Sequence, residues 1–179
     1  MKGGITAVNI LETERLLLRE MTPNDLESLC RTLKDDKAMA AYEGAFDDAM
    51  VGEWLENQFR RYREDGFGLW AVILKETGQW VGQCGLTWQE FDGRQVLEVG
   101  YLLERAYWHN GYATEAAVAC KEYAFQNLHA REVYSIIRDS NTASQRVAMR
   151  NGMVPVGSLV KHYRGVKMPH LVFCVKREP

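Results

Sequence analysis

The sequence lacks the features that would assign the protein to a membrane, to a secretory route or to nucleic acid. No apolar run approaches the roughly 20 residues of a spanning helix, and the N-terminal stretch has one lysine and no apolar core of signal-peptide length. A net charge of −2 provides no basic field for nucleic acid. We therefore predict a cytoplasmic protein whose partners include neither a membrane nor nucleic acid.

The cysteines are too scattered for a metal centre or a disulfide framework. They form no CxxC pair and no Cys/His cluster, so free and mostly buried thiols are expected at Cys30, Cys84, Cys120 and Cys174. The sequence also lacks GxxxxGK[ST] and GxGxxG, which leaves little support for an unrelated nucleotide-binding α/β protein. The length of 179 residues, with 46% hydrophobic and 26% charged residues, is ordinary for one soluble domain.

The chain alternates strand-like and helix-like patterns without an interdomain linker. Early helices are predicted at "TPNDLESLCRTL", with Thr22 as N-cap, and at "FDDAMVGEWLENQFRRYRED", capped by Asp47 or Asp48. Later helices are predicted from Thr114 to about Leu128 and over "NTASQRVAMRNG". Strands are expected at "RLLLRE", "LWAVIL", "WVGQCGLTW", "VLEVGYLL", "VYSIIR", "VPVGSLV" and "HLVFCVK". This order predicts a mixed sheet with helices on its faces.

The stretch "YWHNGYATEA" suits an anion. It lies between a strand and a helix N-terminus, where backbone N–H groups have no intrahelical partner and the helix dipole is positive. Gly111 and Ala113 would let the backbone approach a phosphate or pyrophosphate closely, with Tyr112 pointing back into the core. The alternative is a small-residue loop shaped only by packing between helix and sheet.

A second motif, "NTASQRVAMRNGM", follows the neighbouring strand, so both motifs could face one ligand. Together with "TERLLLREMTPNDLESL", "GLWAVILKETGQWVGQCGL" and "LEVGYLLERAYWHNGYATEA", it makes the chain resemble the GNAT superfamily of acetyl-CoA-dependent N-acyltransferases. The pattern is most similar to the branch that includes ribosomal-protein N-terminal acetyltransferases and their small-molecule relatives.

The resemblance implies one GNAT-like N-acetyltransferase domain over residues 1–179. Its fold would be α/β (mixed α+β), a largely antiparallel sheet of about seven strands with helices on both faces. The activity would be acetyl transfer from acetyl-CoA, the cosubstrate, to a primary amine of a small molecule or a protein N-terminus, by direct attack in a ternary complex. Homodimers are frequent among relatives. A CoA-binding regulatory module with little catalysis is the alternative.

The resemblance also implies which residues hold acetyl-CoA. Unpaired N–H groups near Gly100, Tyr101 and Leu102 would face the pantetheine arm and polarise the thioester. The diphosphate would lie on the backbone of Trp108, His109, Asn110, Gly111, Tyr112, Ala113 and Thr114. His109 stands where the family commonly has glycine, so this position needs negative φ or local strain. Asn141 would orient the pantetheine amide, and Arg146 could steer a CoA phosphate.

Glu98 and Ser144 are the candidate catalytic residues. Glu98 interrupts an apolar strand and could take the amine proton through water; the alternative is a carboxylate on the wet face of that strand. An α-amine, with its lower pKa, is easier to deprotonate than a lysine amine. Ala148 stands where many relatives place a tyrosine, and Ser144 resembles a serine close to the CoA sulfur. Alternatively, Asn141 caps a helix and Ser144 only occupies its first turn.

The acceptor pocket is the least defined part. The first two helices and the closing strands shape it in relatives, so aromatic, acidic and histidine side chains there are candidates: Tyr42, Glu43, Trp54, Phe67, Trp70, Trp88 and His170. Acidic Glu43, Asp47 and Asp48 could attract a cationic amine, although acidic residues at a helix start are also explained by the dipole.

Overall fold

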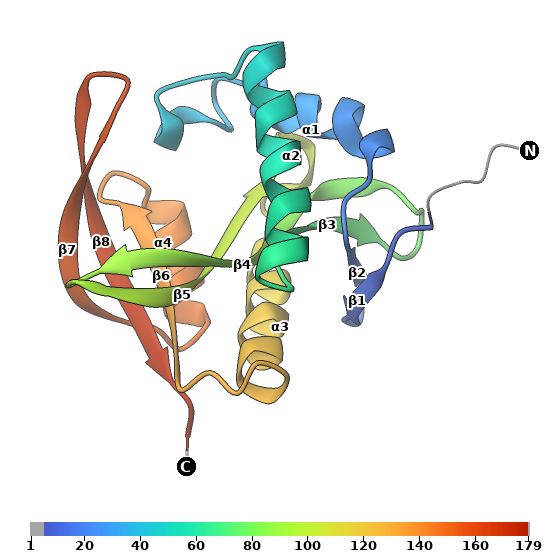
Figure 1. The fold of residues 1–179 in the computed structure, drawn as a ribbon. Helices are drawn as coiled ribbons and strands as arrows, with labels where there is room; N and C mark the ends of the chain where they lie inside the picture. The colour runs from blue at the N-terminus through green and yellow to red at the C-terminus, as the bar shows by residue number, and fades with distance from the viewer. Residues whose placement is uncertain (1–5, 179) are drawn as a thin grey trace, which may run out of the picture.

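An eight-stranded sheet forms the centre of the computed structural model, which describes residues 6–178 (Figure 1). The N-terminal stretch, for which the sequence predicted no signal peptide, includes residues 1–5, and these lie outside the described range. The strands are β1 (Asn9–Glu12), β2 (Leu16–Arg19), β3 (Leu69–Leu74), β4 (Trp80–Phe91), β5 (Arg94–Leu103), β6 (Glu132–Arg138), β7 (Val154–Tyr163) and β8 (Val166–Lys176). Their order is β1-β2-β3-β4-β5-β6-β8-β7, so the blue β1–β2 hairpin and the red β7–β8 hairpin stand at opposite ends.

Helices cover both faces of the sheet, as the sequence predicted. The helices are α1 (Leu26–Leu33), α2 (Asp48–Glu64), α3 (Tyr112–Gln126) and α4 (Thr142–Arg150), with short 3₁₀ turns at Pro23–Asp25, Ala40–Tyr42 and Arg105–Tyr107. One core joins α3 and α4 to Trp70 and Val72 of β3, and a second joins α1 and α2 to Leu69 and Ala71. Because alternate residues of a strand face opposite ways, β3 contributes to both cores.

Local signals located most elements correctly. Asp47 caps α2 by accepting a hydrogen bond from Met50 N (2.8 Å), and Gly66 follows the helix with φ 79°. All four cysteines are free, and three of them are buried. Within residues 6–178, no helix is both long and apolar enough to cross a membrane.

The first strand and the start of α3 differ from the sequence prediction. Strand β1 was not predicted, because its four residues pair with β2 alone and carry no clear alternation of buried and exposed positions. Helix α3 begins at Tyr112, two residues before the expected Thr114, with Gly111 as its N-cap at φ 79°. Part of the supposed anion loop is therefore the first turn of a helix.

Strands β5 and β6 run parallel and then separate. The two strands are paired where Glu98 of β5 lies beside Tyr134 of β6. Just beyond that pair, side chains replace backbone partners: Ser135 Oγ donates to the Val99 carbonyl (3.0 Å), and Ile136 N donates to Glu98 Oε1 (3.2 Å). These two backbone groups thus keep hydrogen-bond partners while the strands diverge and leave a gap in the middle of the sheet.

Close backbone packing beside this gap requires glycine at position 85. Gly85 lies opposite Gly100 of β5, and a Cβ on it would stand 2.0 Å from the Gly68 carbonyl oxygen. We expect Gly85→Ala to lower the free energy of unfolding by about 3 kcal/mol in urea denaturation, because the clash is with backbone that cannot move aside. As a control, Gly52→Ala within α2, where a Cβ meets nothing within 4 Å, should raise stability by about 1 kcal/mol. Equal stability of Gly85→Ala and wild type would contradict this account.

Candidate active site

A cavity of about 940 Å³ follows the gap between β5 and β6. On one side of the sheet it reaches the starts of α3 and α4, and on the other it reaches α2 and the β7–β8 hairpin. All predicted site residues except Asn110 line it: Glu98, Gly100, Tyr101, Leu102, Trp108, His109, Gly111, Tyr112, Ala113, Thr114, Asn141, Ser144 and Arg146. The structure therefore brings two sequence motifs about 30 residues apart to one space.

The start of α3 offers free backbone donors to this cavity. The first helical hydrogen bond runs from Glu115 N to Gly111 O (3.0 Å). The N–H groups of Tyr112, Ala113 and Thr114 therefore have no intrahelical acceptor, and no hydrogen bond within residues 6–178 uses them. Their position at the positive end of the helix dipole fits a diphosphate.

The sequence required either a negative φ or local strain at His109, and in the structure His109 has the strained conformation. Its φ is 63°, in the left-handed region, and its side chain is exposed at the cavity mouth. A non-glycine residue can hold this conformation at a modest cost, and histidine tolerates it better than most residues. The loop therefore keeps the shape that glycine would favour.

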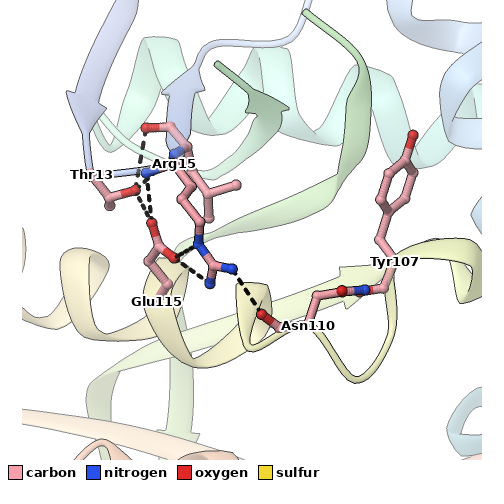
Figure 2. Close-up of polar contacts among 6 residues, drawn as sticks. Thr13, Arg15, Tyr107, Asn110 and Glu115 are labelled. Atoms are coloured by element: carbon pink, nitrogen blue, oxygen red, sulfur yellow. Dashed lines mark hydrogen bonds and ion pairs between the residues drawn. The ribbon is translucent and has the colours of Figure 1, made fainter. Parts of the chain in front are cut away.

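An ion pair holds the anion loop from outside the cavity, and Figure 2 shows its members converging. Glu115 of α3 accepts hydrogen bonds from Thr13 Oγ1 (2.6 Å), Arg15 N (3.0 Å) and Arg15 Nε (2.7 Å) in the β1–β2 turn. Arg15 Nη1 donates to the Asn110 carbonyl (3.0 Å), and the guanidinium lies 4.5 Å from the Tyr112 ring centroid. Partial burial would raise the pKa of Glu115, but these hydrogen bonds hold it below its ordinary value.

Sequence reasoning missed this contact. Arg15 and Glu115 lie 100 residues apart, and neither interrupts a pattern. The backbone of Asn110 was expected to help hold the diphosphate, but Asn110 is absent from the cavity lining, and its side chain donates to the Tyr107 (3.2 Å) and Trp108 (2.9 Å) carbonyls. Asn110 therefore braces the loop, together with Arg15, and lies away from the cavity lining.

Strand β5 exposes a backbone donor to the gap. The carbonyls of Val99 and Leu103 turn toward the gap, where they accept from Ser135 Oγ and from Trp108 Nε1 (3.0 Å). Because N–H and C=O of alternate residues point to the same side of a strand, the Tyr101 N–H points into the gap. The N–H groups of Gly100 and Leu102 point toward β4, so the unpaired donors expected near these positions reduce to Tyr101.

Asn141 caps α4, as the alternative prediction had it. Its Oδ1 accepts from Ser144 N (3.2 Å), which places Ser144 in the first turn of the helix. Both residues still line the cavity, and the Ser144 carbonyl accepts from the Tyr101 hydroxyl (3.0 Å), which ties α4 to β5. Ala148, at the position of the missing tyrosine, is 2% exposed.

Glu98 lies on the other face of the sheet from Ser144, toward α2. Its carboxylate opens to the cavity and not to an open wet face, which argues against the alternative drawn from sequence. Burial raises the pKa of Glu98 above its ordinary value, while Lys161, the hydrogen bond from Ile136 N and Arg61 act in the opposite direction. A carboxylate with a raised pKa is a better proton acceptor for an amine than an ordinary one.

Only some of the residues predicted to shape the acceptor pocket line the cavity. Tyr42, Trp54 and His170 line it. Glu43 forms an ion pair with Arg138. The remaining aromatic side chains do not line the cavity: Trp70 packs against Tyr123 of α3, and Phe67 packs against Trp88. These three tryptophan and phenylalanine positions were therefore wrong as pocket residues, because apolar periodicity does not distinguish a core face from a cavity wall.

The class of this protein is N-acetyltransferase, because a family model and named N-acetyltransferase relatives match the chain. The family model described as "Acetyltransferase (GNAT) domain" matches residues 15–154, and the chain belongs to this family. The uncharacterized protein YkkB of Bacillus subtilis (strain 168) is 38% identical over 144 residues, which are 80% of this chain and 84% of that protein.

Solved structures share the fold. An acetyltransferase (GNAT family) from Bacillus anthracis has a TM-score of 0.78 at 22% identity, covering 96% of this chain and 98% of its own. The ribosomal-protein-S5-alanine acetyltransferase from Vibrio fischeri has a TM-score of 0.74 at 15% identity, covering 96% and 97%. Identities this low establish the architecture and leave the acceptor open.

The buried state of Glu98 predicts a pH-dependent stability. A carboxyl whose pKa is raised on folding stabilises the protein fully below its ordinary value of 4.5, and this stabilisation is lost as pH rises through the folded pKa. Glu98→Gln removes that dependence. The melting temperature of the variant relative to wild type should therefore increase from pH 4.5 to pH 8. A difference that stays constant with pH would show that Glu98 titrates as an exposed group.

The ion pair behind the anion loop predicts a defect in acetyl-CoA binding. We expect Glu115→Gln to raise the acetyl-CoA dissociation constant roughly tenfold in calorimetry, because a charge-assisted hydrogen bond to the loop support is weakened. Glu122→Gln, an exposed position on the same helix, is the matched control and should bind as wild type does. Unchanged affinity in Glu115→Gln would mean that the loop keeps its shape without this pair.

Proposed function

We propose that the protein transfers an acetyl group from acetyl-CoA to a primary amine by direct attack within a ternary complex. The observation that carries this proposal is the single cavity that passes through the gap between β5 and β6. Its α3 side supplies anion donors, and its α2 side supplies Glu98. A thioester in the gap would meet an amine from the opposite face of the sheet.

Each residue has a defined part in this reaction. The α3 start would hold the diphosphate, and the Asn141 amide would face the pantetheine arm. The Tyr101 N–H would donate to the thioester oxygen as negative charge develops on it. The amine nitrogen forms a bond to the carbonyl carbon, the carbon–sulfur bond breaks, and the amine proton passes to Glu98 through water. Ser144 Oγ would hydrogen-bond the departing thiolate.

The acceptor remains to be identified within this scheme. The sequence motifs resemble a branch that includes ribosomal-protein N-terminal acetyltransferases, which makes a protein N-terminus one candidate. A small-molecule amine is the other. An α-amine suits Glu98 in either case, because its pKa lies much closer to that of a buried carboxyl than the pKa of a lysine amine does.

Binding and turnover together test the proposal. We expect calorimetric titration to show micromolar binding of acetyl-CoA and CoA, with ATP silent, and amine-dependent release of CoA thiol. The buried Ala148, in place of a tyrosine, favours a regulatory acyl-CoA-binding module as the second candidate. Binding of acetyl-CoA with slow hydrolysis and no thiol release by any amine would support that module, and absence of binding would exclude both functions.

The role of Glu98 gives a kinetic prediction. Glu98→Gln should lower kcat by about 10²- to 10⁴-fold, the usual contribution of a general base, without weakening acetyl-CoA binding. Glu56→Gln, at an exposed position on α2 outside the cavity, is the matched control. Full turnover of Glu98→Gln between pH 6 and pH 9 would remove Glu98 from the mechanism.

A further inference from the structure

The part of the cavity on the α2 face is rich in cations. Lys37, Arg61, Arg138 and Lys161 line it, whereas the lining carboxylates are Glu53 and Glu98. Arg138 already has a partner, since it forms an ion pair with Glu43. With Arg138 paired, Lys37, Arg61 and Lys161 remain beside two carboxylates in this part of the lining.

The acidic residues that could have attracted a cationic amine are occupied elsewhere. Asp48 forms an ion pair with Lys34, and Asp47 caps α2. Glu43 is held by Arg138. The sequence-based expectation that these three side chains draw a cation into the pocket is therefore not supported by their contacts.

Arg61 and Lys161 lack a carboxylate partner within 4.0 Å in the part of the chain that the structure describes. Both side chains are half-buried. Arg61, from α2, donates to Gln58 Oε1 (3.2 Å), and burial lowers its pKa. The Lys161 ammonium, from β7, forms no hydrogen bond or ion pair within residues 6–178. Arg61 and Lys161 line the same cavity as Glu98, one from α2 and the other from β7, and the charges of both oppose burial, which raises the pKa of Glu98.

Half-buried cations without a partner are costly unless an anion reaches them. We infer that the acceptor is a small amino acid whose carboxylate lies against Arg61 and Lys161 while its amine faces Glu98. This inference rests on the proposed function, because it assigns the substrate class of that same cavity. The two cations orient the acceptor, and Glu98 takes the proton from it.

Matched amines test the inference directly. The panel consists of the proteinogenic amino acids, the carboxamide of each, a polyamine and short peptides with free N-termini, all assayed by CoA thiol release. We expect at least one amino acid to be acetylated with kcat/KM tenfold or more above its carboxamide. The amine of a carboxamide is easier to deprotonate than that of the free amino acid, so amine pKa alone would favour the carboxamide. A preference for the amino acid must therefore come from its carboxylate.

Variants of the two cations locate the preference. Arg61→Gln and Lys161→Gln should each raise KM for the amino acid about tenfold, bring acid and amide closer together and leave acetyl-CoA affinity unchanged. Arg60→Gln and Lys167→Gln, at exposed positions outside the cavity, are the matched controls. A protein that is only destabilised would not lose the difference in KM between amino acid and carboxamide while it keeps its affinity for acetyl-CoA.

Each alternative outcome has a distinct meaning. Acetylation of carboxamides or a polyamine as efficiently as amino acids would overturn the inference and leave the proposed function intact. Acetylation of peptides alone would do the same and assign a protein N-terminus as acceptor. Binding of acetyl-CoA with no thiol release from any member of the panel would overturn the inference together with the catalytic proposal.

Discussion

The separation of β5 from β6 is the constraint on which the site depends. A parallel pair that continued its ladder would close the sheet and divide the molecule into two unconnected faces. Ser135 and Glu98 prevent this by supplying side-chain partners to Val99 O and Ile136 N, so these two backbone groups keep a hydrogen bond as the strands part. The gap then connects the start of α3 to the side of the sheet that α2 covers.

The Glu98 carboxylate therefore both supports the backbone of β6 and faces the cavity. Its Oε1 is engaged by the β6 backbone, while the carboxylate as a whole faces the cavity and is surrounded by protein. Burial favours the protonated form, and the cations Lys161 and Arg61 favour the charged form. The pKa of Glu98 depends on the balance between these opposing effects, and burial is the largest of them.

The support for the anion loop comes from the far edge of the sheet. The β1–β2 turn supplies Thr13 and Arg15, and these fix Glu115 one turn inside α3. The same guanidinium holds the Asn110 carbonyl and covers Tyr112. A loop that contains His109 at positive φ is thus stabilised by contacts outside the ligand space, which leaves the helix N–H groups free for an anion.

Local sequence patterns determined the helices, most strands, the anion-binding helix start and the unusual carboxylate in β5. These features depend on residues only a few positions apart, such as Asp47 with Met50 or Asn141 with Ser144. Tertiary structure alone decided that Arg15 meets Glu115, that β5 and β6 part, and that Arg61 and Lys161 line the same cavity as Glu98. The physical reason is that these contacts join segments brought together by strand order, and no short-range periodicity records which strands become neighbours.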